Sequence, residues 1–81
     1  MTAAVIPLVT DQEALYEAWI AARRAHVAQP TAATEAECLR AFKPYYVRFI
    51  GKDWRDEFGR YYAAEVEWCR MIVARVRYRH G

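Results

Sequence analysis

The chain has 81 residues, a hydrophobic content of 56% and a formal net charge of +2 at neutral pH. This length allows one domain with a modest core, and the apolar content excludes an intrinsically disordered chain. No apolar run approaches the ~18 residues of a membrane span, and residues 1–9 lack the basic start of a secretory signal. We therefore expect a single cytoplasmic domain, residues 1–81, that does not bind membranes.

Capping and proline signals define the first third of the chain. Residues 1–9 are aliphatic but contain a proline, which removes a backbone donor, so we expect an extended N-terminal arm. Residues 10–13 form a capping box that begins a helix. This helix is expected to end near Ala28, because Pro30 disfavours helical geometry at the preceding residue. The buried stripe at helical spacing consists of Leu15, Trp19, Ala22 and His26.

The middle of the chain allows two interpretations. A second capping box at residues 34–37 predicts a helix that ends near Phe42, before Pro44. Residues 45–50 are aromatic and β-branched with rough alternation, as in a strand. Pro44 at a first helical position favours a short helix instead. Because a lone strand would have only the N-terminal arm to pair with, the short helix is our prediction and the strand is the alternative.

The longest apolar pattern runs from Asp53, the expected N-cap, to Arg79. Its apolar residues cover an arc of roughly 220°, against the ~100° stripe of a surface helix. We therefore predict an all-α fold of three main helices plus one short helix, with this long C-terminal helix at the centre. A strand over residues 45–50 would change the fold class to α+β.

Glu65 lies near the middle of this apolar arc, where a carboxylate must be paired or protonated. One interpretation is a general acid or base with a raised pKa. Another is a structural carboxylate bonded to a tyrosine, to His26 or to Arg48. If the first and last helices pack antiparallel, Glu65 and His26 could meet. Such a pair would be a catalytic dyad, half of a metal site, or a polar contact that fixes the packing, and we favour the last.

The sequence lacks the usual signals of chemistry. Two cysteines, Cys38 and Cys69, are too few and too widely spaced for a disulfide scaffold or a cysteine-based zinc site. Both fall on apolar helical faces, so we expect buried thiols, with one bridge between them only if their helices meet. No nucleotide-binding loop, hydrolase motif or metalloprotease motif occurs. We expect no enzymatic activity, no cofactor and no metal.

The leading functional hypothesis uses one flank of the C-terminal helix. Tryptophan, tyrosine, methionine and arginine, which are enriched in protein interfaces, recur on this flank. The predicted interface residues are Ala64, Trp68, Met71, Arg75 and Tyr78. The hypothesis is a small non-enzymatic protein–protein interaction module, an inhibitor or adaptor, that binds a protein partner or a second copy of itself.

The alternative hypothesis is nucleic-acid binding by the arginine-rich end of the same helix. Arg70 and Arg77 lie seven residues apart on one expected edge, and Arg55 extends that edge. Two acids, Glu57 and Glu67, share the helix. The isoelectric point of 8.7 is below the ~9 typical of a nucleic-acid-binding domain, so this hypothesis is second.

Overall fold

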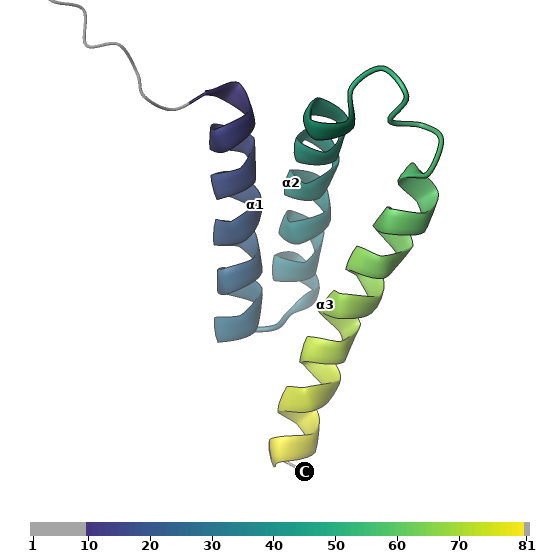
Figure 1. Ribbon diagram of the computed structural model, residues 1–81. Coiled ribbons are helices and arrows are strands. Elements are labelled where there is room, and N and C mark those ends of the chain that lie inside the picture. Colours follow the sequence, from purple (N-terminus) through teal and green to yellow (C-terminus); the bar gives the residue numbers. More distant parts are fainter. Residues whose placement is uncertain (1–9, 81) are drawn as a thin grey trace, which may run out of the picture.

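The computed structural model describes residues 10–80, without the side chains of 78–80, and within this range it is all-α (Figure 1). Its helices are α1 (Asp11–Ala28), α2 (Ala32–Ile50) and α3 (Phe58–His80). The helices α1 and α2 form an antiparallel hairpin, and α3 returns along α2. The all-α prediction is confirmed. The predicted N-terminal arm lies outside the described residues.

Helix α1 begins and ends where its sequence predicts. The Thr10 hydroxyl accepts a hydrogen bond from the Glu13 backbone N–H at 3.1 Å. The Glu13 carboxylate accepts one from the Thr10 backbone N–H at 2.8 Å. These reciprocal bonds satisfy two donors that the first turn would otherwise leave unpaired. The helix ends at Ala28, which confirms the predicted boundary.

Helix α2 begins earlier than predicted, because Thr31 and not Thr34 is its N-cap. Thr31 has extended backbone angles, φ −141° and ψ 170°. Its hydroxyl accepts from the Thr34 backbone N–H at 3.0 Å, and the Thr34 hydroxyl accepts from the Thr31 N–H at 2.8 Å. The Thr34 hydroxyl thus takes the place that glutamate or glutamine normally has in a capping box.

Pro44 lies inside α2 and does not interrupt it, so the predicted separate short helix and the alternative strand over 45–50 are both wrong. Proline leaves the carbonyl four residues earlier, at Arg40, without its helical donor. Arg40 and Pro44 are both exposed, so water can satisfy that carbonyl. Meanwhile Phe42 and Tyr46, on either side of the proline, are buried on one face. Burial of this continuous face favours one helix.

Helix α3 begins at Phe58, five residues after the predicted start at Asp53. The intervening residues form turns, in which the Trp54 N–H donates to the Gly51 carbonyl and the Asp56 N–H to the Asp53 carbonyl, both at 3.1 Å. Gly51 has a φ of 90°, a conformation that favours glycine, and it allows the chain to leave α2.

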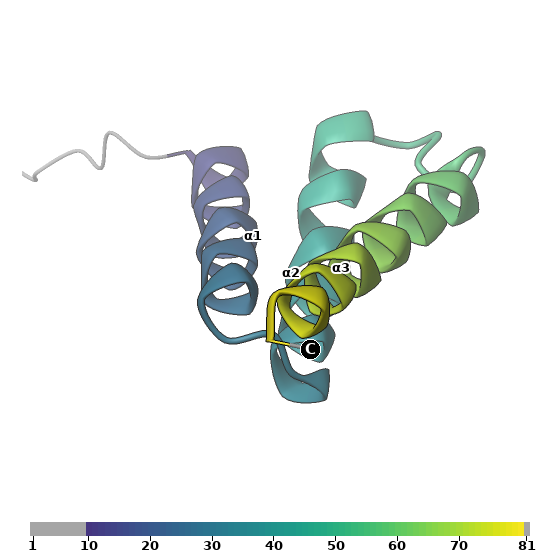
Figure 2. The same cartoon turned by 90° about the horizontal axis from the view of Figure 1, so that it is seen from below.

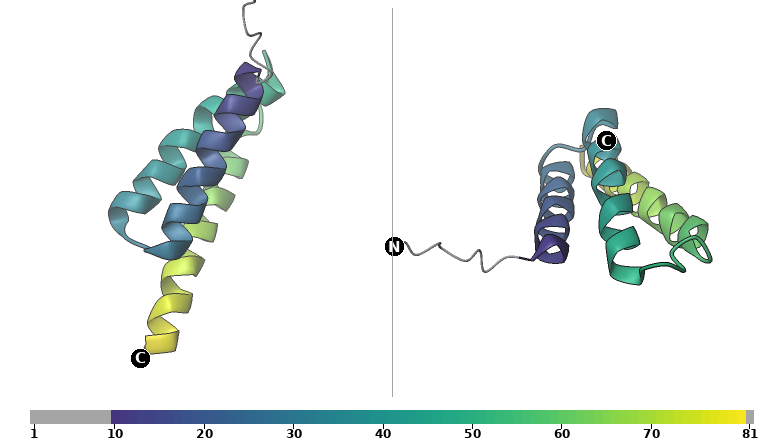
Figure 3. Two further views of the ribbon diagram at one scale, coloured as in Figure 1. Left: turned by 90° about the vertical axis from the view of Figure 1, so that its left-hand side faces the viewer. Right: turned by 90° about the horizontal axis from the view of Figure 1, so that it is seen from above.

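The central element is α2 and not α3 as predicted, because α1 and α3 each contact α2 more extensively than they contact each other. Helices α1 and α3 lie far apart at the end that carries the α2–α3 connection and approach each other toward the opposite end (Figure 2). The last turns of α3 extend past the α1–α2 connection (Figure 3). Helix α2 is central because its aromatic face packs on both neighbours. On this face, Phe42 contacts Trp19 of α1 and also Phe58 and Tyr62 of α3.

The core is small and depends on aromatic contacts. Its buried hydrophobic residues are Cys38, Phe42, Tyr46, Cys69 and Ile72. Ring pairs such as Phe42–Tyr46, with centroids 5.6 Å apart, add about 0.5–1.5 kcal/mol each beyond the area that they bury. Within the described residues, no helix combines the length and hydrophobicity that crossing a membrane requires.

Replacing Pro44 by alanine should stabilise the protein. Alanine restores the missing hydrogen bond inside α2 and has the higher helix propensity, whereas proline contributes only by restricting the unfolded chain. We expect the free energy of unfolding, measured by urea denaturation, to rise by about 1–3 kcal/mol. A loss of stability would mean that residues 32–50 do not form one helix in solution.

Candidate functional site

Glu65 of α3 is 3% exposed and makes three hydrogen bonds to α1. The Arg23 guanidinium donates to both carboxylate oxygens, from Nε at 3.0 Å and from Nη2 at 2.5 Å. The Trp19 indole Nε1 donates to the second oxygen at 2.9 Å. This bidentate geometry pairs the buried carboxylate with an opposite charge and fills its acceptor positions. The predicted buried carboxylate is therefore present, but its arginine partner is Arg23 and not Arg48.

Two tryptophans pack on the Arg23 guanidinium. Its Cζ atom lies 4.5 Å from the ring centroid of Trp19 and 4.1 Å from that of Trp68. A cation within ~6 Å of a ring face is attracted by the π electrons. The side chain of Arg23 is 29% exposed, so the cluster reaches the surface between α1 and α3. We call Trp19, Arg23, Glu65 and Trp68 the ionic cluster.

His26 does not bond to Glu65, which answers the question that the sequence left open. The ring is fully buried, with Nε2 2.8 Å from the Cys69 carbonyl and Nδ1 2.8 Å from the Thr34 hydroxyl. Because a carbonyl only accepts, Nε2 is the donor. His26 thus joins α1 to the backbone of α3 and to the start of α2. The arrangement provides no acid–base dyad.

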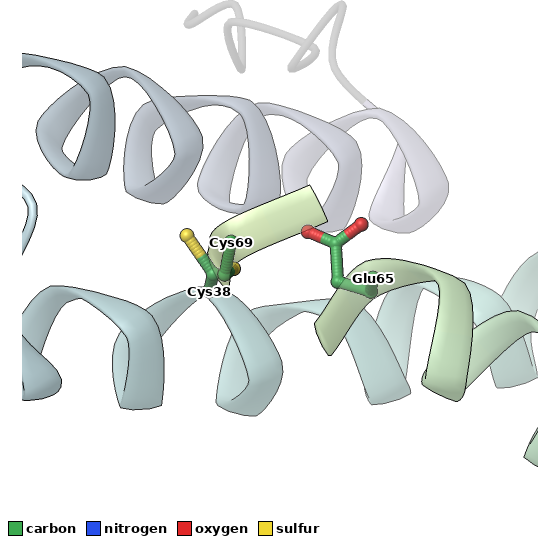
Figure 4. Close-up of side chains that lie close together, drawn as sticks. All are labelled: Cys38, Glu65 and Cys69. Carbon is green, nitrogen blue, oxygen red and sulfur yellow. The ribbon is translucent and has the colours of Figure 1, made fainter. Parts of the chain in front are cut away.

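The thiols of Cys38 and Cys69 lie beside Glu65, and each cysteine is free (Figure 4). Their helices do meet, as a bridge would require. The Cys38 thiol donates to the Ala22 carbonyl at 3.2 Å. Burial raises the pKa of Cys69 to about 12, with a further contribution from Cys38, and burial also raises the pKa of Cys38. Both sulfurs are therefore protonated thiols at neutral pH.

The potential ligand atoms of Cys38, Glu65 and Cys69 lie within 4.8 Å of one another. We therefore asked whether these three residues could bind a metal ion. A structural zinc site needs four ligands, and cysteine binds zinc as the thiolate. Here the carboxylate is already occupied by Arg23 and Trp19, and burial opposes ionisation of the thiols. An ion would also be placed beside the positive charge of Arg23. The residues in this arrangement do not fit a metal site.

The predicted interface residues all belong to α3, and the structure brings three of them together. Ala64, Trp68 and Met71 line, with Glu67, a shallow hollow of about 300 Å³. Met71 is 49% exposed, and Ala64 is also exposed. Trp68 is half-buried because one ring face packs on Arg23. Arg75 is exposed one turn further along α3. The side chain of Tyr78 is not among those that the structure describes.

The structure does not bring the three arginines of the alternative hypothesis together. Arg70 and Arg77 are exposed on α3, whereas Arg55 is in the turn before this helix. At a rise of 1.5 Å per residue, the span from Phe58 to Arg77 is about 28 Å. Arg55 packs on the ring of Trp54, and Arg70 Nε is 3.7 Å from a carboxylate oxygen of Glu35. The arginines therefore form no single basic surface.

Sequence reasoning missed an open hollow of about 450 Å³ at the end where α1 and α3 separate. We call it the aromatic hollow, and its lining residues are Trp19, Phe42, Tyr45, Tyr46, Phe49, Ile50, Asp53, Asp56, Glu57 and Tyr61. Two signals were present: the aromatic pair Tyr45 and Phe49 at helical spacing, and the acids that follow. Because those acids were assigned to the start of a helix, they were not considered as part of a site.

No protein-family model, curated protein or solved structure matches this chain. The assignment of function therefore depends on the geometry of its own residues. In that geometry, the hydrogen-bonding groups of the ionic cluster bind one another, and the buried thiols are protonated. The aromatic hollow and the hollow at Ala64, Trp68 and Met71 remain exposed. Of these, the exposed surfaces are the parts that are available to a second molecule.

Replacing Glu65 by alanine should destabilise the protein by about 2–4 kcal/mol, because Arg23 and Trp19 lose their acceptor. The partial exposure of Arg23 keeps the effect below that of a fully buried broken pair. Glutamine keeps one acceptor and the shape, so Glu65→Gln should cost less. Urea denaturation of both variants provides the measurement. A neutral effect of Glu65→Ala would contradict the buried pair.

The raised pKa of Cys69 predicts a loss of stability at alkaline pH. The unfolded thiol ionises near its ordinary value of 9.0, whereas the folded thiol resists ionisation up to about 12. The contribution to stability is therefore complete below pH 9 and is lost as pH rises toward 12, by at most about 1.4 kcal/mol per pH unit. The variant Cys69→Ala should show a shallower decline of unfolding free energy between these values. Parallel declines would contradict the assignment.

Proposed function

We propose that the chain is a small non-enzymatic protein–protein interaction module, of the inhibitor or adaptor type. Its binding surface is the outer stripe of α3, which we define as Ala64, Trp68, Met71 and Arg75. The observation that supports the proposal is that this stripe is apolar at its centre and yet remains open, while a different face of α3 supplies the core.

The spacing of the outer stripe suits a second helix. Its members follow one another at intervals of four, three and four residues, the pattern that places side chains along a helix–helix contact. Ala64 is small and allows a close approach of the partner backbone. Trp68 provides a large apolar area and is already held in position by Arg23. A surface that is ordered before binding loses less entropy on association.

The charges around the stripe indicate the chemistry of the partner. Glu67 borders the apolar centre, and Arg75 lies at its end, so the stripe has the apolar core and polar rim of a protein interface. The partner is an amphipathic helix with a complementary apolar face. A second copy of this chain presents such a face, and a two-fold dimer would bury both stripes at once. Self-association is therefore the first case to test.

The variant Met71→Glu should abolish association through the outer stripe. A charge at an exposed position leaves the fold intact but must be desolvated in the interface. Light scattering over a concentration series should show dimers of the wild-type chain and a shift of the dissociation constant by about tenfold or more in the variant. Circular dichroism should show unchanged helix content.

The matched control is Val27→Glu, which places the same charge on an exposed apolar residue of α1. This control should dimerise like the wild type. If the wild-type chain is monomeric, the same three proteins are compared for binding to partners from the native cell extract. Equal behaviour of wild type and Met71→Glu in both experiments would refute the proposed function.

A further inference from the structure

The aromatic hollow is open, and its floor is a series of rings. The ring centroids of Trp19 and Tyr45 are 5.2 Å apart with an interplanar angle of 15°. Tyr45 and Phe49 are stacked at 5.9 Å and 21°. Phe49 is 58% exposed and Tyr61, from α3, is 47% exposed. A volume of about 450 Å³ lies in the range of small-molecule sites, about 300–1,000 Å³.

The rim of the hollow is acidic. The α2–α3 turn contributes Asp53, Asp56 and Glu57, and no lysine, arginine or histidine is among the lining residues. Glu57 pairs with Arg60 at 3.0 Å. Asp53 and Asp56 form no ion pair with any residue that the structure describes. In a chain with a net charge of +2, this hollow is a local concentration of negative charge.

The pKa of Tyr46, which lines the hollow, is raised. Burial raises the pKa of its hydroxyl, and the neighbouring Tyr61, Glu57 and Asp56 raise it further. The hydroxyl therefore stays protonated and can donate, while the carboxylates accept. Cations pack on the ring of Trp54, which follows Asp53 in the chain: Lys43 Nζ lies 5.5 Å and Arg55 Cζ 4.6 Å from its centroid.

We propose that the aromatic hollow binds a small organic cation, an ammonium or guanidinium group carried on an aromatic body. The rings attract the charge and cover the apolar part, and Asp53 and Asp56 neutralise the charge. A neutral ligand would desolvate these carboxylates without compensation, and an anion would be repelled. A bare metal ion would be bound by the carboxylates and would gain little from the apolar ring faces, which have no apolar ligand part to cover. This site is separate from the outer stripe and does not depend on the proposed function.

The test uses three matched probes: 2-phenylethylammonium, the neutral 2-phenylethanol and the anion phenylacetate. Each is titrated into the full chain and followed by backbone amide NMR shifts and tryptophan fluorescence. The cation should bind about tenfold more tightly than the alcohol, with shifts at Phe49, Asp56 and Tyr61, and the anion should not bind. The double variant Asp53→Asn/Asp56→Asn should lower the affinity for the cation about tenfold, to the level of the alcohol.

Two controls separate the charge from the rings. Glu37→Gln/Glu67→Gln removes two carboxylates that do not line the hollow and should leave the affinity for the cation unchanged. Phe49→Ala should weaken the binding of both the cation and the alcohol, because both ligands pack their aromatic part on this ring. The proposal fails if the alcohol binds as tightly as the cation, if the two aspartates make no difference, or if the cation does not bind at about 10 mM, a weak limit even for a ligand of this size.

Discussion

The ion pair between Glu65 and Arg23 determines how the first and last helices meet. Helices α1 and α3 share little apolar contact, since α2 lies between them and contributes most of the buried rings. What joins them is polar: the bonds of Glu65 with Arg23 and Trp19, and the bond from His26 to the Cys69 carbonyl. Such contacts add little net energy relative to an apolar pair of the same shape, but they tolerate only one geometry. They therefore specify the crossing of the helices more than they stabilise it.

This constraint also explains why the aromatic hollow and the outer stripe are open in the described part of the chain. The polar contacts of Glu65 join α1 to α3, and the two helices separate toward the α2–α3 connection (Figure 1). Among the described residues of this three-helix fold, none covers the rings of α2 at that end, and these rings line the aromatic hollow. The outer stripe lines a hollow formed by residues of α3 alone, without a contribution from α2. A short chain rich in large side chains cannot bury all of them.

Features that depend on local residue patterns could be predicted from the sequence. Features that depend on long-range packing could not. The capping box of Thr10 and the burial of Glu65 follow from spacing alone, and both are confirmed. Continuity of α2 through Pro44 depends on the rings that α1 and α3 place against it, which no local rule contains. The hydrogen-bond partner of Glu65 could not be predicted either, because the sequence does not give the relative rotation of two helices. Arg23 and Arg24 are adjacent, and only that rotation determines which one faces the carboxylate.

Arg23 connects the core to both surfaces, and this follows from the position of its two tryptophans. Trp19 contacts the guanidinium and also lines the aromatic hollow, while Trp68 contacts the guanidinium and belongs to the outer stripe. A ligand in the hollow that moves the Trp19 ring would therefore act on a bond to Glu65 and, through Arg23, on the orientation of Trp68. Coupling of this kind requires that binding changes the energies of two alternative arrangements. The cluster is suited to it, because the indole and the guanidinium share one carboxylate oxygen, so a shift of either donor changes the acceptor that remains for the other.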